Sequence, residues 1–91
     1  MTRLDGKIAI VTGAASGIGR ASAIAMAANG ASVDVADVNL AGATDVVAEL
    51  RATGAEALAI KVDVSEADQV EPMVRQTVKR FGGGDLLRRR H

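Results

Sequence analysis

Residues 12–19 (TGAASGIG) constrain this chain more than any other feature of its sequence. They follow Lys7–Thr12 (KIAIVT), an apolar and β-branched run that predicts a buried strand. They lead into residues 16–29, an alanine-rich segment that predicts a helix ending at Gly30. Glycines between a strand and a helix allow a sharp turn and a close approach of an anion to the free N–H groups of the helix start. The stretch therefore predicts a phosphate-binding loop.

Each glycine of this loop has its own expected role. Gly13 allows the turn, Gly17 lets a pyrophosphate come near the backbone, and Gly19 lets the helix pack closely against the sheet. The structural alternative is a flexible loop with chance glycines, which the position between a strand and a helix disfavours. A P-loop is excluded, because four spacer residues after Gly13 lead to Ile18 and not to Gly-Lys.

The rest of the sequence continues the alternation of strand and helix. Further strands are expected over Ser32–Asp37 and residues 57–62, and further helices over residues 40–53 and 65–81. Single helices between successive strands imply right-handed crossovers and a parallel sheet. The sequence therefore predicts one α/β domain.

Three residues of these elements need comment. Pro72 removes a backbone hydrogen bond inside the last helix at a cost of about 3 kcal/mol, so we expect a kink there or a helix that begins near Asp68. Asp34 lies in the middle of a strand that should be buried on both faces, where a charge needs a partner or solvent. Ser65 is the expected N-cap of the last helix.

Acidic residues follow the second and third strands. Asp37 follows Gly19 by the roughly 20 residues at which an acid can accept hydrogen bonds from an adenosine ribose. Its charge would repel the additional phosphate of NADP, so NAD is the favoured cofactor. Asp63 and the N–H of Val64 can contact an adenine ring. The alternatives are a solvated residue at the strand end for Asp37 and a turn residue for Asp63.

The composition disfavours several other classes of function. Lys+Arg and Asp+Glu number 11 each and Phe81 is the single aromatic residue, so neither charge nor stacking favours nucleic acid. The arginines of residues 88–90 offer only weak, salt-sensitive phosphate contacts, and the lone terminal His91 is read as solvated. Without cysteine we expect no metal site. No run approaches the roughly 18 apolar residues of a membrane span, so a cytoplasmic location is the default.

The motif Thr12-Gly13-x-x-x-Gly17-Ile18-Gly19 resembles the cofactor motif of the short-chain dehydrogenase/reductase family. The likeness covers roughly residues 4–87 and includes, in the family's order, Leu4-Asp5-Gly6-Lys7, Asp37, Asp63-Val64 and Phe81-Gly82-x-x-Asp85. It implies NAD(P)-linked oxidation of alcohols or reduction of carbonyls. It also implies a Rossmann-like doubly wound parallel sheet, truncated here after about three βα units.

The resemblance also assigns site residues. The residues that would line the pyrophosphate are Gly13, Ser16, Gly17, Ile18 and Gly19, while Asp37 would hold the ribose and Asp63 with Val64 the adenine. Family members that prefer NADP often carry a basic residue where Ser16 or Val38 stands here, which again favours NAD. Arg20 is read as a surface residue of the helix within reach of a phosphate.

The end of the chain departs from the family. After Leu87 the family continues an apolar strand into Asn-Asn-Ala-Gly, whereas residues 88–91 form a divergent basic tail that resembles the product of a frameshift or early stop. The family's catalytic Ser, Tyr and Lys lie farther on, the chain has 0 Tyr, and none of its lysines matches. We therefore expect residues 1–87 to be an NAD(P)-binding half without catalytic residues. The alternatives are a non-catalytic dinucleotide-binding module and a non-functional truncated product.

The charged tail has an expected structural consequence. A fourth strand that begins at Asp85 meets charge at Arg88, so the first strand would keep an unpaired apolar edge. Such edges invite association with other chains. Self-association through an exposed sheet edge is therefore expected.

Overall fold

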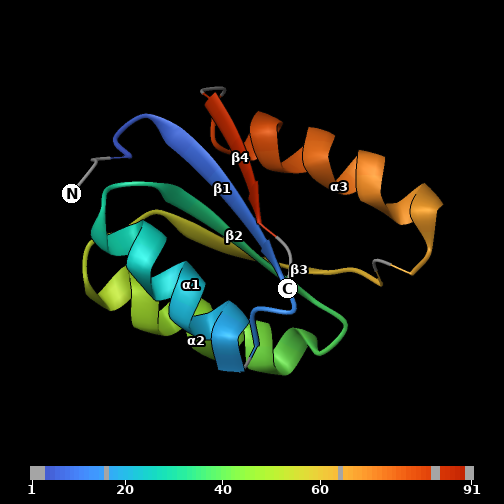
Figure 1. Ribbon diagram of the computed structural model, residues 1–91, viewed down its shortest axis with the longest axis horizontal. Helices are drawn as coiled ribbons and strands as arrows, with labels where there is room; N and C mark the ends of the chain where they lie inside the picture. The colour runs from blue at the N-terminus through green and yellow to red at the C-terminus, as the bar shows by residue number, and fades with distance from the viewer. Residues whose placement is uncertain (1–3, 16, 64, 83–84, 90–91) are drawn as a thin grey trace.

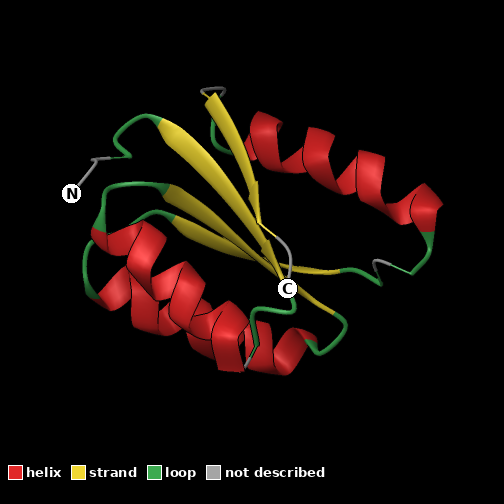
Figure 2. Ribbon diagram, in the orientation of Figure 1, coloured by secondary structure: helices red, strands yellow, loops and turns green. Residues whose placement is uncertain are grey.

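The computed structural model describes residues 4–15, 17–63, 65–82 and 85–89 of the 91-residue chain. Strands and helices alternate along it (Figure 1, Figure 2). In chain order they are β1 (Lys7–Thr12), α1 (Gly17–Ala28), β2 (Ser32–Asp37), α2 (Leu40–Ala52), β3 (Ala57–Lys61), α3 (Ala67–Arg80) and β4 (Asp85–Arg89). The strands form one parallel sheet in the order β3-β2-β1-β4, with α1 and α2 on one face and α3 on the other (Figure 1).

This arrangement confirms the predicted Rossmann-like fold and the three βα units. The bounds of β1 and β2 coincide with the predicted ranges, and β3 ends one residue earlier at Lys61. The predicted helices are also present, and α3 begins at Ala67, close to the expected start near Asp68, and runs through Pro72.

The expectation of an unpaired β1 edge is wrong. β4 pairs with β1 in parallel, from Lys7 opposite Asp85 to Val11 opposite Arg89. The hydrogen bonds of such a ladder join backbone groups, so a charged sequence does not prevent them. Charged residues are moreover common on the outermost strand of a sheet. The edge strands in the described part of the chain are therefore β3 and β4.

The predicted N-cap of α3 is also wrong. Glu66 occupies the N-cap position, and its side chain makes no capping hydrogen bond. Ser65 instead donates from both its N–H and its hydroxyl to Oδ1 of Asp63, at 3.0 and 2.6 Å. An aspartate readily accepts a hydrogen bond from the N–H group two residues later, so Asp63 binds Ser65 in the turn after β3. The hydroxyl of Ser65 therefore does not cap the N-terminus of α3.

Two apolar cores hold the helices against the sheet. The core under α1 and α2 consists of small and β-branched side chains, among them Ala23 and Ala27 of α1 and Val46, Val47 and Leu50 of α2. Alanines on α1 allow that helix to lie close to the strands. The core under α3 joins Ile10, Ala36, Val62 and Met73. Both faces of β1 and β2 are thus covered, as expected for the central strands of a parallel sheet.

No helix in the described ranges combines the length and apolarity needed to cross a membrane.

Candidate cofactor-binding site

The predicted site residues gather at the carboxyl ends of β1, β2 and β3. The glycine loop follows β1, Asp37 ends β2, and Asp63 follows β3. Carboxyl ends of parallel strands share one edge of the sheet, which is where open α/β sheets bind ligands. A backbone hydrogen bond of 3.0 Å from the N–H of Val62 to the carbonyl of Asp37 ties the third strand end to the second.

The loop has the backbone that its glycines make possible. Gly13 and Gly17 have φ angles of 66° and 63°, in the left-handed region that glycine adopts without strain. Both are exposed, and a Cβ atom built on Gly17 would meet nothing within 4 Å. Gly19, one turn into α1, is buried. The loop therefore presents open backbone at the start of a helix, where its free N–H groups attract anions.

Hydrogen bonds fix the loop to β2. The N–H of Ala14 donates to the carbonyl of Ala36 at 3.4 Å, and the N–H of Ala15 donates to Oδ2 of Asp37 at 3.0 Å. The other oxygen of Asp37 accepts from the N–H of Asn39 at 2.9 Å. A carboxylate offers about four acceptor positions, so two remain for further donors such as sugar hydroxyls.

Two residues that the sequence analysis did not single out support the loop from α2. Asn39 caps this helix by accepting from the N–H of Gly42 at 3.1 Å. A Cβ atom on Gly42 would lie 2.8 Å from Nδ2 of Asn39 and 3.0 Å from Cβ of Ala15. Only glycine lets the start of α2 pack this closely under the loop. An asparagine directly before the first helical residue was the available signal.

Asp63 takes part in a turn at the edge of the site. Its Oδ1 accepts both hydrogen bonds from Ser65, and its own N–H donates to Oε1 of Gln69 at 3.0 Å. The hydroxyl of Ser65, and next its N–H, lower the pKa of the Asp63 carboxyl below its ordinary value. The structure thus contains the turn that was the alternative for Asp63, and its role toward adenine stays a prediction. Ser16 and Val64 lie outside the described residues.

Arg20 lies on the surface of α1, as predicted, and binds Glu49 of α2. Its Nε donates to Oε1 of Glu49 at 3.1 Å, and its Nη2 donates to Oε2. In this arrangement the guanidinium joins two helices, and no hydrogen bond links it to the described residues of the loop.

Exposed apolar side chains also gather at this end of the sheet. Among the large hydrophobic residues exposed in the described part of the chain, Ile18, Val38 and Leu40 lie here, whereas Ile24 is exposed farther along α1. Ile18 lies in the first turn of α1 and is 69% exposed, while Val38 and Leu40 follow β2 and are 57% and 45% exposed. Ligand sites are mostly apolar with a few polar groups, so these side chains are suitable walls for a cofactor.

Comparison with known proteins agrees with this geometry. The model of the family described as short chain dehydrogenase matches residues 7–89. The chain belongs to the short-chain dehydrogenase family.

Several members of the short-chain dehydrogenase family are similar in sequence. The chain is 43% identical over 88 residues to a 3-oxoacyl-[acyl-carrier-protein] reductase of Synechocystis sp., covering 96% of this chain and 36% of that protein. It is 45% identical over 85 residues to galactitol 2-dehydrogenase of Agrobacterium fabrum, covering 93% of this chain and 32% of that protein. The chain therefore spans about a third of the length of the relatives it matches.

Solved short-chain dehydrogenase structures have the same fold. The hydroxysteroid dehydrogenase of Escherichia coli matches with a TM-score of 0.87 and 40% identity over 93% of this chain and 36% of that chain. A family member from Burkholderia phymatum in complex with NAD matches with a TM-score of 0.83 and 40% identity, over 90% of this chain and 29% of that chain. A 7α-hydroxysteroid dehydrogenase complexed with NADH and 7-oxo glycochenodeoxycholic acid matches with a TM-score of 0.86 and 40% identity, over 92% of this chain and 33% of that chain.

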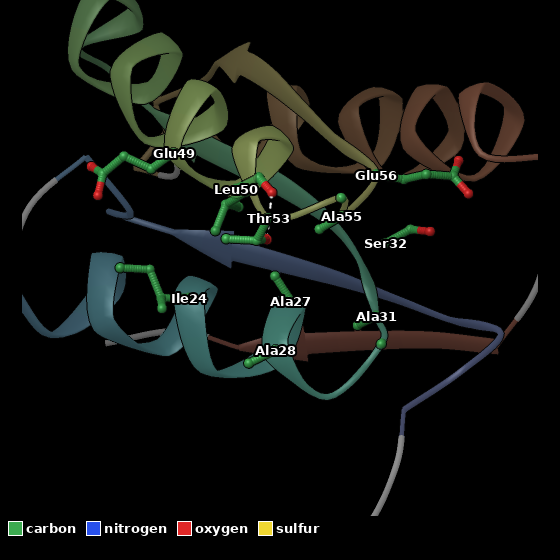
Figure 3. Close-up of a pocket in the computed structure, with 12 residues that line it drawn as sticks. Ile24, Ala27, Ala28, Ala31, Ser32, Glu49, Leu50, Thr53, Ala55 and Glu56 are labelled. Carbon is green, nitrogen blue, oxygen red and sulfur yellow. Dashed lines mark hydrogen bonds between the residues drawn. The ribbon is translucent and has the colours of Figure 1, made fainter.

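A hollow of about 480 Å³ lies at the opposite end of this short-chain dehydrogenase sheet (Figure 3). It is lined by the last turns of α1 and α2 and by the residues that lead into β2 and β3, including Ala27, Ala31, Leu50 and Ala55. Helix carboxyl ends repel anions. The hollow therefore does not suit the phosphates of a dinucleotide, and the glycine loop remains the candidate site.

Proposed function

We propose that this chain binds the adenosine and pyrophosphate part of NAD as the cofactor-binding half of a short-chain dehydrogenase. The observation that carries the proposal is the 3.0 Å hydrogen bond from the N–H of Ala15 to the Asp37 carboxylate. It holds an acceptor for ribose hydroxyls beside a helix start that attracts phosphate. The bound cofactor would supply the nicotinamide that exchanges a hydride with an alcohol or a carbonyl.

Each part of the cofactor has its own residues in this proposal. The pyrophosphate lies over the loop at Gly13, Gly17 and Ile18, and Ser16 lines the same side. Gly19 takes part through its burial, because it lets α1 approach the strands. The ribose hydroxyls donate to the free acceptor positions of Asp37. The adenine lies toward Asp63, whose Oδ2 has no hydrogen bond among the described residues, and toward the N–H of Val64.

NAD is proposed over NADP on electrostatic grounds. Asp37 is an acid at the position where the additional phosphate of NADP would lie, and like charges repel. Val38, the next residue, is apolar, and the guanidinium of Arg20 is bound to Glu49. Two of the solved relatives are complexes with NADH and NAD, which supports a nicotinamide cofactor here.

The chemistry of the reaction is proposed to lie outside this chain. The resemblance places the family's Ser, Tyr and Lys beyond the matched region, and the 91 residues include no tyrosine. The chain by itself is therefore expected to bind cofactor without transferring hydride. There are two competing proposals. The chain is a non-catalytic binding module, which would still bind NAD, or a non-functional product, which would not.

The proposed setting is the cytoplasm, with a dinucleotide and no nucleic acid as ligand. Self-association through a sheet edge stays a prediction. Because β1 is paired on both sides, such contact would use the outer edge of β3 or of β4.

Isothermal titration calorimetry with NAD, NADP and ADP-ribose tests the proposal. We expect ADP-ribose to bind nearly as well as NAD, since the adenosine side carries the contacts, and NADP to bind more weakly. Gly17→Ala should weaken NAD binding, because its Cβ would enter the space above the loop. Gly54→Ala is the matched control, since Gly54 also has a positive φ (90°) and open space but follows α2 at the opposite end. Equal NAD affinity in both variants would contradict the proposed phosphate site.

A further inference from the structure

Asp34 places a carboxyl group inside the core between the sheet and α3. Its side chain is 0% exposed. The strand register sets it between two apolar residues, Ile10 of β1 and Leu58 of β3. A carboxylate in such a place loses its hydration and needs hydrogen-bond donors in return. The donors available to Asp34 therefore decide whether it carries a charge.

The hydrogen bonds around Asp34 leave it short of donors. Its Oδ2 lies in hydrogen-bond contact with Oγ1 of Thr77 in α3, and its Oδ1 has no partner among the described residues. Oγ1 of Thr77 also lies 2.8 Å from the carbonyl oxygen of Met73. A hydroxyl group has one proton, and the carbonyl can only accept. If Thr77 donates to Met73, the proton in its contact with Asp34 must come from Asp34.

The surroundings of Asp34 also favour its protonated state. Burial raises the pKa of Asp34 from its ordinary value of 3.8 to about 6, and the Thr77 hydrogen bond opposes this rise. No charged side chain faces Asp34 from β1, β3 or α3, because its neighbours there are Ile10, Leu58 and Thr77 and the charged residues of α3 are exposed. From β4, Arg88 occupies the position in register with Ile10. Arg88 is thus two strands from Asp34, or about 10 Å between Cα atoms.

We propose that at mildly acidic pH Asp34 is a protonated carboxylic acid in the folded chain and donates to Thr77, which donates to the carbonyl of Met73. This relay of two hydrogen bonds joins β2 to α3 and depends on one proton. The unfolded chain releases that proton near the ordinary pKa of aspartate, whereas the folded chain retains it to higher pH. The contribution to stability is therefore complete below the unfolded pKa and is lost as the pH rises through the folded pKa. Above it, α3 packs over a buried charge.

Carbon-13 NMR of labelled aspartate in the full chain, without cofactor, tests the protonation directly. We expect Cγ of Asp34 to titrate near pH 6, well above the ordinary aspartate value of 3.8. Arg88→Gln should leave this midpoint unchanged. A midpoint at or below the ordinary value of 3.8 would show an ionised Asp34 and overturn the proposal. So would a midpoint that rises in Arg88→Gln, because that result would identify an ion pair.

Urea unfolding at pH 5 and pH 8 tests the consequence for stability. In the unaltered chain the unfolding constant should rise about tenfold between these pH values because of Asp34. Asp34→Asn should remove this rise, since an amide can donate to Thr77 at both pH values. Asp45→Asn, which removes an exposed carboxylate of α2, should retain it. An unchanged pH dependence in Asp34→Asn would refute the relay, whatever the outcome of the NAD titrations.

Discussion

The N–H of Ala15 donates to Oδ2 of Asp37 at 3.0 Å and so joins the glycine loop to the end of the neighbouring strand. The other carboxylate oxygen holds the turn that leads into α2 through the N–H of Asn39. One side chain thus fixes both loops that border the proposed ribose position. Its acceptor positions toward solvent remain available for a ligand, so we propose a binding role for the same group in addition to its structural one.

Asp37→Asn separates these roles in part. The amide can still accept one of the two backbone hydrogen bonds, but it lacks the charge and the second acceptor oxygen. Loss of charge-assisted hydrogen bonds to the ribose should cost about 1.5–3 kcal/mol, which is roughly a 10- to 100-fold weaker affinity for NAD. The preference for NAD over NADP should shrink at the same time, because the repulsion of the additional phosphate is removed.

Calorimetry with both cofactors measures this change, and Asp45→Asn is the control for a removed surface charge. Asp45 is exposed on α2, so its replacement should change neither affinity. If Asp37→Asn bound NAD as tightly as the unaltered chain, Asp37 would be a structural residue only.

The sequence was sufficient for the order of elements and for the positions of the glycine loop and of Asp37 at the strand ends. The alternation of apolar strands and alanine-rich helices specified β1 and β2 to the residue, because buried parallel strands and helix-ending glycines leave clear patterns. The glycine spacing and Asp37 likewise located the loop and its acidic neighbour. Local signals of this kind act over a few residues and can be read without knowledge of the tertiary structure.

Contacts between distant segments could not be predicted in the same way. From the sequence alone, Gly42 is only an unfavourable residue in a helix, and its contact with Ala15 is seen only in the structure. Thr77 likewise gave no sign of being buried until the structure placed Asp34 beside it. β4 pairs with β1 through backbone hydrogen bonds, so the charged side chain of Arg88 gave no indication of whether this strand would form. Ser65 had two competing partners, and only the geometry of the turn decided between the helix and Asp63.

Ser65→Ala should change the titration of Asp63. The hydroxyl of Ser65 is the main cause of the lowered pKa of that carboxyl, so its removal should raise the pKa toward the ordinary value of 3.8. The N–H of Ser65 remains and should keep part of the effect. Because the folded pKa is depressed, this group favours folding above the unfolded pKa and loses its contribution as the pH falls through the folded value.

Carbon-13 NMR of Asp63 in acid solution follows this change directly. Ser22→Ala, a replacement in α1 away from the turn, should leave the Asp63 titration unaltered. An Asp63 midpoint that is the same with and without the Ser65 hydroxyl would contradict the turn geometry.

Gly42→Ala tests the support that α2 gives to the loop. The new Cβ would lie 2.8 Å from Nδ2 of Asn39 and 3.0 Å from Cβ of Ala15, so the cap or the loop must shift. Alanine favours a helix over glycine by about 1 kcal/mol, and a weakened cap costs a similar amount. Overall stability should therefore change by less than about 1 kcal/mol. The displaced loop should bind NAD about fivefold more weakly, because the loss of one hydrogen bond costs roughly 1 kcal/mol of binding free energy.

Urea unfolding and NAD calorimetry on the same samples distinguish these effects. Ala48→Gly is the converse control, because Ala48 is exposed on α2 and away from the loop. It should lower stability by about 1 kcal/mol through helix propensity and leave NAD affinity unchanged. If Gly42→Ala lowered mainly the affinity for NAD and Ala48→Gly lowered mainly the stability, the role of Gly42 would be to support the glycine loop. A Gly42→Ala variant that binds NAD like the unaltered chain would show that the loop tolerates the displacement and that glycine is not required at this position for binding.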